Sequence, residues 1–384
     1  PQAYIFSGEE AFNLEKINKL KKFHLKDLLL IFLTFFSASV LILNPQIGRL
    51  GVFTGGKYCT EILIPSLFPL MFLSRFVIFS GMFDFLKKPL DKIMKFVFYL
   101  PGCAAPAILL SLVGGYPVGA SSVKALFEKK EISNEELNRM MIFTVNAGPA
   151  FTISVVGETL LKNRSLGIML FLVQSSVSII LGIAAGITAR IKKIKFNKNK
   201  KISNKKAKIS EAVVLAASKT SVSIVEMCAL ITVFTVIISL FENLNILNFL
   251  AEKFRLNSKN FSCLIFSSLE ITSGSFFAAK NHVSFPLICL GVSYGGLCTH
   301  FQIASILSGT KFNYLKFQFF RVINSACCLL ATTFLLKFFA QTAPVFISGH
   351  TALTPSTSST ILGSSMLLAL CIYFTAESKI FLSK

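Results

Sequence analysis

GGYPVG, at residues 114–119, interrupts one long apolar stretch of the chain, and NAGP, at residues 146–149, interrupts the next. Both breaks lie in segments apolar enough to enter a membrane, where lipid offers no partner for a free backbone N–H or C=O group. Irregular backbone survives at membrane depth only where it is buried in protein or lines a cavity. Helices interrupted by Gly and Pro in corresponding parts of two repeats are the best sequence pointer to a transport site.

The composition is that of a membrane protein. Of the 384 residues, 53% are hydrophobic and only 15% are charged, whereas a soluble domain averages about 25% charged residues. The mean hydropathy is +0.67. We therefore predict an all-α polytopic membrane protein with about eight transmembrane helices, two re-entrant or broken helical segments, and inverted repeats.

The net charge of +21 indicates a membrane surface rather than nucleic acid. The basic residues fall mostly in short loops between apolar segments, as the positive-inside rule expects. We therefore expect the partner of this charge to be anionic lipid at the cytoplasmic face of the cell membrane, and we expect no binding of nucleic acid.

Apolar segments divide the chain into predicted helices and two broken segments. The predicted helices are residues 28–43, 60–82, 140–161, 166–189, 212–240, 283–307, 314–339 and 361–375, and the broken segments are residues 104–126 and 261–279.

Charge decides which apolar segments cross the membrane. The lysine-rich arm at residues 16–26 and the loop at 191–209, with nine lysines and no acidic residue, should both be cytoplasmic. An even number of crossings must separate them, but five apolar segments lie between. We assign 104–126 as a re-entrant hairpin because its middle is Gly-Gly-Tyr-Pro. If the broken segment at 261–279 is also a re-entrant hairpin that does not cross the membrane, the loop at 341–356 lies outside and both termini lie in the cytoplasm.

The same order of segments occurs twice and predicts inverted repeats. Thr60-Glu61 lines up with Val225-Glu226, and each pair is followed by a broken segment, a helix with a Gly-containing break, and a full helix. The predicted parts are a cytoplasmic arm with the first helix (1–59), a first repeat (60–190), the basic loop (191–209), a second repeat (210–340), and an outer loop with the last helix (341–384).

In the first repeat, the candidate solute-binding residues are Gly115, Tyr116, Pro117, Asn146 and Gly148. The backbone of a hairpin tip and the ends of half-helices can meet a polar solute, and an asparagine amide both donates and accepts hydrogen bonds. The competing interpretation is structural. Small residues allow close helix packing, and a carbonyl freed by proline can be satisfied by a neighbouring helix.

In the second repeat, the candidates are Glu270, Thr272, Ser273 and Gln302. A carboxylate within the membrane is costly and indicates a function such as carrying a coupling proton or holding a cation. The alternatives are a carboxylate near the surface or one with a structural partner. His300 can line the same cavity, but a lone membrane histidine is more often an interhelical hydrogen bonder.

No pattern for an enzyme is present in the sequence. The nine cysteines are scattered, without the spacing of a zinc site. His, Cys and carboxylate residues do not form a catalytic or metal-binding set. We therefore expect no enzymatic activity, no bound metal and no cofactor.

The residues around both breaks resemble a known family. LVGGYPVGA at 112–120 and FTVNAGPAF at 143–151 are similar to motifs of the YlbJ-type sporulation integral membrane proteins, which belong to the wider nucleoside-recognition (Gate) domain group. EITSG at 270–274 and GVSYGG at 291–296 look like the elements of its second half. The resemblance covers roughly residues 60–339.

The resemblance implies a multi-pass membrane protein of an endospore-forming bacterium, with a role in assembly of the spore cortex. It also suggests kinship to concentrative nucleoside carriers, which use re-entrant hairpins and inverted repeats. We therefore expect a transporter-like protein that moves a small polar solute, such as a nucleoside-like one. The alternative is a membrane scaffold or sensor that does not transport and recruits spore-envelope proteins, with the loop at 191–209 as its contact.

Overall fold

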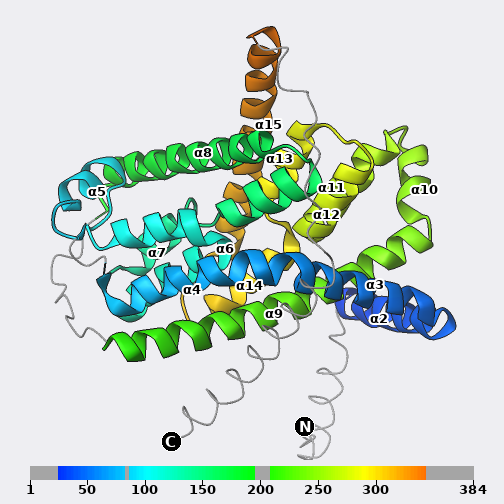
Figure 1. Ribbon diagram of the computed structural model, residues 1–384, viewed down its shortest axis with the longest axis horizontal. Helices are drawn as coiled ribbons and strands as arrows, with labels where there is room; N and C mark the ends of the chain where they lie inside the picture. Colours follow the sequence, from blue (N-terminus) through cyan, green and yellow to red (C-terminus); the bar gives the residue numbers. More distant parts are fainter. Residues whose placement is uncertain (1–24, 83–85, 195–207, 343–384) are drawn as a thin grey trace, which may run out of the picture. The chain divides into compact units, whose positions relative to one another are not determined.

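The computed structural model describes residues 25–82, 86–194 and 208–342, and every regular element in these ranges is a helix (Figure 1). The chain forms two compact units, residues 1–50 and 51–384. The first contains α2 (Leu25–Leu43), and α3 (Pro45–Lys57) begins there and ends in the second. The predicted arm at 16–24, the loop at 343–356 and the helix at 361–375 lie outside the described residues, as does most of the basic loop.

Six of the described helical stretches are long and apolar enough to cross a membrane, which confirms the polytopic all-α class. They are Pro45–Ser80, Ala104–Glu128, Arg164–Ile191, Ile209–Asn243, Phe285–Ile306 and Tyr314–Phe338. The first starts earlier than the predicted residue 60, since α3, the π-helix η1 (Tyr58–Leu63) and α4 (Ile64–Ser80) follow one another. It ends at Gly81, whose left-handed backbone (φ +64°) caps the helix.

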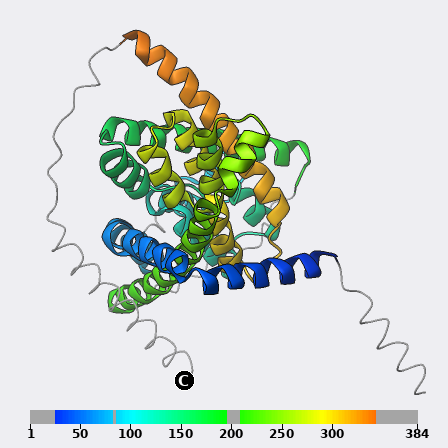
Figure 2. The same cartoon turned by 90° about the vertical axis from the view of Figure 1, so that its right-hand side faces the viewer.

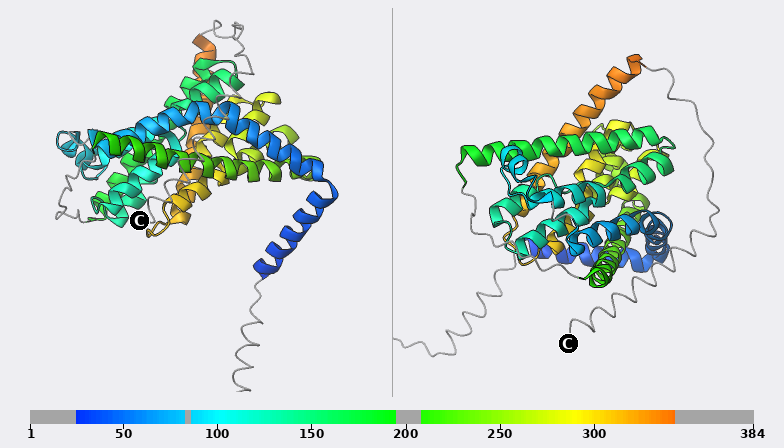
Figure 3. Two further views of the ribbon diagram at one scale, coloured as in Figure 1. Left: turned by 60° about the horizontal axis from the view of Figure 1, so that its bottom comes forward. Right: turned by 60° about the vertical axis from the view of Figure 1, so that its left-hand side comes forward.

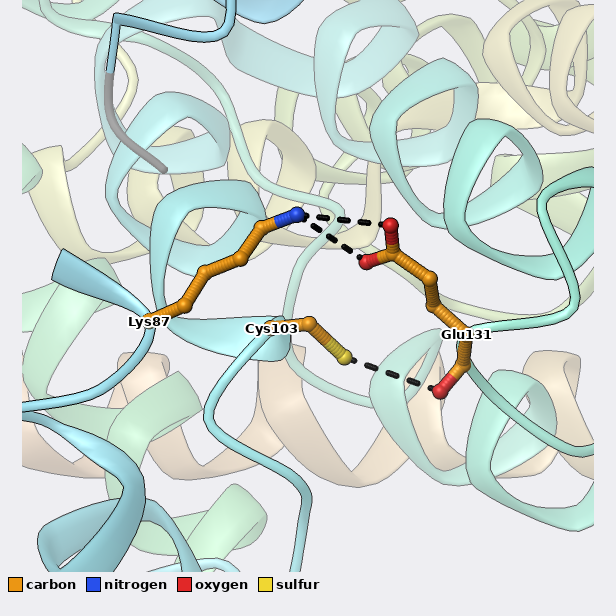
Figure 4. A network of polar contacts seen from close by, with 3 residues as sticks. All are labelled: Lys87, Cys103 and Glu131. Carbon is orange, nitrogen blue, oxygen red and sulfur yellow. Dashed lines mark hydrogen bonds and ion pairs between the residues drawn. The ribbon is translucent and has the colours of Figure 1, made fainter. Parts of the chain in front are cut away.

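The α6 helix (Ala104–Glu128) is a hairpin with its tip in the GGYPVG break. Gly115 has φ +77° and ψ −164°, so the helical backbone is interrupted there. The two ends of α6 meet, because the Cys103 thiol before it lies 3.6 Å from the Glu131 carbonyl oxygen after it (Figure 4). Half of its 25 residues rise about 18 Å, somewhat more than half of a hydrocarbon core about 30 Å thick. This segment therefore has the predicted hairpin geometry.

A second hairpin is formed by α11 (Ser258–Leu269) and α12 (Ile271–Lys280). The turn between them is Glu270, whose backbone is extended. The Phe266 and Phe277 rings meet edge to face with centroids 5.0 Å apart. A Cβ atom at Gly274 would lie 2.4 Å from the Ser267 Cα atom, so only glycine permits this approach of the two arms.

The helix predicted over 140–161 is present only in its second half, after the predicted NAGP break. The α7 helix (Asn134–Met140) ends where the predicted helix was expected to begin, residues 141–148 are not helical, and the π-helix η3 (Ala150–Leu160) starts directly after Pro149. Proline has no N–H group for a helical ladder. The carbonyl groups of this stretch instead find partners on other helices, as described below, so the backbone needs no helix to remain satisfied.

The predicted break in the segment at 283–307 is present. The α13 helix (Phe285–Tyr294) and the α14 helix (Gly296–Ile306) are separated at Gly295, and Gly295 and Gly296 have φ of +94° and +70°. Both halves pack on α11, but the α13 half also packs on α15 (Tyr314–Thr342), whereas the α14 half also packs on α6 and α9 (Ile209–Asn243). This discontinuous helix thus connects different parts of the second unit.

The first helices of the two predicted repeats pack side by side and run in opposite directions (Figure 3). Near one end, the Thr235 hydroxyl donates to the Gly51 carbonyl at 2.9 Å. Further along, the Cys59 thiol lies 3.9 Å from the Cys228 carbonyl oxygen. Sequence numbers rise along α3–η1 while they fall along α9, as inverted repeats require. Orientation in the membrane remains a prediction.

The order of elements recurs, but the packing of the two repeats differs. In the first repeat, α4 is followed by a hairpin (α6), an interrupted segment (α7–η3) and a long helix, α8 (Arg164–Ile191). In the second repeat, α9 is followed by a hairpin (α11–α12), an interrupted segment (α13–α14) and a long helix, α15. The α8 helix packs on η3, after its break, whereas α15 packs on α13, before its break (Figure 2). The domain boundaries proposed from the sequence remain predictions.

Candidate functional site

Both hairpin tips and both interrupted segments contribute to one cavity of about 50 Å³. Small-molecule sites usually have volumes of about 300–1,000 Å³, so the surrounding helices must move apart to admit a solute. Most of the wall is apolar. The lining residues are Leu63, Leu67, Met71, Gly114, Gly115, Tyr116, Pro117, Ala147, Gly148, Phe151, Met227, Ile231, Glu270, Ile271, Thr272, Cys298, Thr299 and Gln302.

Seven of the nine predicted site residues line this cavity, and the other two lie directly behind its wall. The seven are Gly115, Tyr116, Pro117, Gly148, Glu270, Thr272 and Gln302. Asn146 and Ser273 do not line it and are buried; Asn146 accepts a hydrogen bond from Arg321, and the Ser273 amide donates to the Glu270 carboxylate. The structure therefore brings the predicted breaks of both repeats to one place.

The tip of α6 meets the NAGP stretch backbone to backbone. A Cβ atom on Gly115 would lie 3.1 Å from the Gly148 amide nitrogen, and one on Gly148 would lie 2.9 Å from the Val113 carbonyl oxygen. The close approach explains why both positions are glycine, and the positive φ of Gly115 adds a second reason. These two glycines form the point of contact between the hairpin and the non-helical stretch.

The carbonyl groups of the NAGP region are taken by side chains from α8 and α15. The Val145 carbonyl, four residues before Pro149, accepts a hydrogen bond from the Arg321 guanidinium. The Ala147 carbonyl accepts one from the Gln174 amide at 3.0 Å. The alternative offered by the sequence, satisfaction of these carbonyls by neighbouring helices, is the arrangement found here.

The C-terminal end of α13 has a partner for each of its last four carbonyl groups. A helix normally leaves these groups without partners inside the helix. The donors are Gly295 N–H to Gly291, the Tyr116 hydroxyl to Val292, the Arg321 guanidinium to Ser293 and Tyr294, and the His300 ring to Tyr294. Tyr116 therefore joins the tip of the first hairpin to the break of the second repeat.

Glu270 caps the N-terminus of α12. Its two carboxylate oxygens accept hydrogen bonds from the amide groups of Thr272 (2.8 Å) and Ser273 (2.6 Å). A carboxylate at a helix N-terminus is also favoured by the helix dipole. The structural interpretation of Glu270 thus accounts for its hydrogen bonds, while the residue still forms part of the cavity wall.

The polar side chains left for a solute are few. Thr299 and Gln302 lie one turn apart on α14, and both line the cavity together with Thr272. The Gln302 amide nitrogen lies 3.8 Å from the Cys298 thiol, a weak contact. These groups can donate and accept hydrogen bonds while Leu63, Met71 and similar residues cover an apolar surface. No group of three or more potential metal ligands occurs among the described residues.

Sequence reasoning missed Arg321, whose side chain is 0% exposed. It lies near the start of the apolar α15, and a positive charge there suggests an ordinary residue at a membrane surface. An arginine within an apolar helix is nevertheless a signal of function or structural pairing. Thr299 and Cys298 were also missed, although they share the helix of Gln302.

The base of the first hairpin is held by an ion pair outside the cavity (Figure 4). The Lys87 ammonium lies 3.3 and 3.2 Å from the two Glu131 carboxylate oxygens, and both side chains are largely buried. Nearby, Asp91 accepts a hydrogen bond from the Gly102 amide at 2.9 Å. Burial acts to raise the pKa of Asp91, but the bonds from Lys95 and Gly102 outweigh it, so its pKa is lowered. These contacts fix the ends of α6.

The fold and the cavity define an all-helical polytopic membrane protein with discontinuous helices around an internal site. The chain is 26% identical over 369 residues to the sporulation integral membrane protein YlbJ of Bacillus subtilis (strain 168). The match covers 88% of this chain and 86% of that protein. The chain is therefore similar along most of its length to a sporulation integral membrane protein of the YlbJ type, as the motifs at both breaks suggested. No family model matches the chain, and no solved structure matches it.

Proposed function

We propose that this protein acts in endospore formation, in assembly of the spore cortex, by moving a small polar solute across the membrane. The membrane class is established by the fold, and the name of the homologue YlbJ supports the link to sporulation. The observation that carries the transport proposal is the single cavity lined by both hairpin tips and both helix breaks. Secondary transporters place their sites between discontinuous helices of two repeats.

The lining indicates the kind of solute. An apolar wall with hydrogen-bonding groups from Thr272, Thr299 and Gln302 suits a molecule with one flat or apolar face and a few hydroxyl or amide groups. A nucleoside-like molecule has these properties. Glu270 is the one side chain in the wall with a carboxylate, and no lysine or arginine is in the lining, so an anionic solute would be disfavoured.

The arrangement also suggests how access to the cavity changes. Two hairpins whose arms rise about half of the membrane thickness can separate the cavity from either side. Movement of one hairpin relative to α4 and α9 would open one side while the other remains closed. The tip of α6 contacts the NAGP stretch through glycine backbone and the end of α13 through the Tyr116 hydroxyl, and these are the contacts that its movement would break.

Transport is tested with purified protein in proteoliposomes and a panel of labelled nucleosides, amino sugars and amino acids. We expect uptake of at least one member of the panel. Gln302→Leu should raise the concentration for half-maximal uptake about fivefold, since one hydrogen bond contributes about 1 kcal/mol. Ser305→Ala, an exposed position on the same helix, is the matched control and should leave uptake unchanged.

The same variants are tested in spores. A Thr299→Phe variant, which fills the cavity, should insert normally but lower the yield of heat-resistant spores. If no solute is taken up and Thr299→Phe gives a normal spore yield, the transport proposal is wrong. That outcome would favour the scaffold or sensor, which does not need the cavity.

A further inference from the structure

We infer that Arg321 is the positioning residue that sets the shape of the cavity, by clamping the three backbone breaks that meet around it. The inference concerns the geometry of the cavity and does not depend on transport. It rests on the burial of Arg321, the identity of its hydrogen-bond acceptors and the sources of those acceptors in the chain.

Arg321 is a buried cation without an acidic partner. It is the largest of the fully buried side chains among the described residues. Among the residues that the structure describes, no carboxylate lies within ion-pair distance of the Arg321 guanidinium. An uncompensated buried charge is strongly destabilising, so other groups must neutralise it.

Carbonyl oxygens freed by the helix breaks provide that neutralisation. Nε donates to Tyr294 at 3.2 Å and Nη2 donates to Ser293, both at the C-terminal end of α13. A cation is favoured at this end by the helix dipole. Nη1 donates to Val145 and lies 3.3 Å from the Asn146 side-chain oxygen. The charge is therefore satisfied only when both breaks are present and close together.

The third break is held through an aromatic ring. The Arg321 guanidinium carbon lies 5.8 Å from the centroid of the Tyr116 ring, within the range of a cation–π contact. Tyr116 lines the cavity at the tip of α6. One side chain on α15 thus contacts the tip of the first hairpin, the NAGP stretch and the end of α13.

A chain of buried side chains steadies the clamp. The Asn324 amide donates to the Ser178 hydroxyl at 2.8 Å, and that hydroxyl donates to the Asn146 side-chain oxygen at 2.7 Å. Asn146 therefore receives hydrogen bonds from both α8 and Arg321. This accounts for the placement of Asn146 behind the cavity wall rather than in it.

Lysine cannot replace this arginine. The guanidinium spreads five N–H donors over a planar fork, whereas an ammonium group is a compact point charge. Arg321→Lys keeps the charge but cannot span acceptors on α13 and on the NAGP stretch together. The variant should let the breaks separate and expose the cavity wall.

The reporter is Cys298, which lines the cavity, as the sole cysteine in an otherwise cysteine-free protein. We expect Arg321→Lys and Arg321→Met to increase its alkylation rate by a small maleimide at least fivefold. Arg75→Lys is the matched control, because Arg75 is also buried but bonds to Ser223 at 2.7 Å, away from the breaks. It should lower the thermal midpoint and leave the Cys298 rate unchanged.

The inference is overturned if both Arg321 variants lower the thermal midpoint while Cys298 reacts at the rate of the parent protein. If neither variant can be purified, Asn324→Leu carries the same test, since it removes only the outer support of the clamp. A twofold or larger increase in the rate is then expected, and an unchanged rate would contradict the inference. If an Arg321 variant loses uptake while the alkylation rate of Cys298 stays unchanged, the result contradicts the clamp but not the transport proposal.

Discussion

Gly115→Ala is the substitution that tests the tip of the first hairpin most simply. Gly115 has φ +77° and ψ −164°, a region that is accessible essentially to glycine alone. Any other residue held there costs about 1–3 kcal/mol. In addition, the new Cβ atom would lie 3.1 Å from the Gly148 amide nitrogen. We therefore expect a loss of about 1–3 kcal/mol of stability.

The assay is equilibrium unfolding of the purified protein in mixed micelles, followed by circular dichroism. The matched control is Gly56→Ala in α3, where a Cβ atom would meet nothing within 4 Å. The Gly56→Ala variant should be as stable as the parent protein or more stable by up to about 1 kcal/mol, since alanine has a higher helix propensity than glycine. If Gly115→Ala unfolds with the same midpoint as Gly56→Ala, the tip does not have the backbone described here.

Three further substitutions test other parts of the account by the same unfolding assay. Lys87→Met should cost about 3–5 kcal/mol because it leaves Glu131 buried without its cation, and adding Glu131→Leu should recover most of the loss; no recovery would exclude the ion pair as the cause. Glu270→Gln should cost at least about 1 kcal/mol, because the glutamine amide keeps only one acceptor oxygen for the amide groups of Thr272 and Ser273, and a variant as stable as the parent would contradict the cap. Asn163→Ala should cost about 1 kcal/mol, since Asn163 accepts from the Leu166 amide as the N-cap of α8; an unchanged midpoint would show that the cap is dispensable.

The membrane fold and the place of the site could be predicted from the sequence, because both depend on local chemistry. Hydropathy predicted most of the long helices, and Gly-Gly-Tyr-Pro predicted the hairpin at α6. Charge counting predicted that one segment folds back, and the contact of Cys103 with Glu131 is consistent with this. The breaks converge because backbone that leaves a helix within a membrane must be buried in protein.

The details of the NAGP region could not be predicted from the sequence. A hydropathy profile cannot distinguish a kinked helix from a non-helical stretch, because both are apolar. The difference is decided by Arg321 and Gln174, which lie far away in sequence and satisfy the free carbonyl groups. For the same reason, Asn146 was expected in the cavity wall, whereas its hydrogen bonds place it in the support behind that wall.

The central claim is that the breaks of both repeats enclose a cavity that binds a solute. The most direct measurement is the alkylation rate of Cys298, as the sole cysteine, with and without each solute of the panel; single Cys263, which is buried but outside the lining, is the control. We predict that the solute taken up by proteoliposomes slows alkylation of Cys298 in a saturable manner and does not affect Cys263. Equal rates at Cys298 with and without a saturating transported solute would contradict the claim.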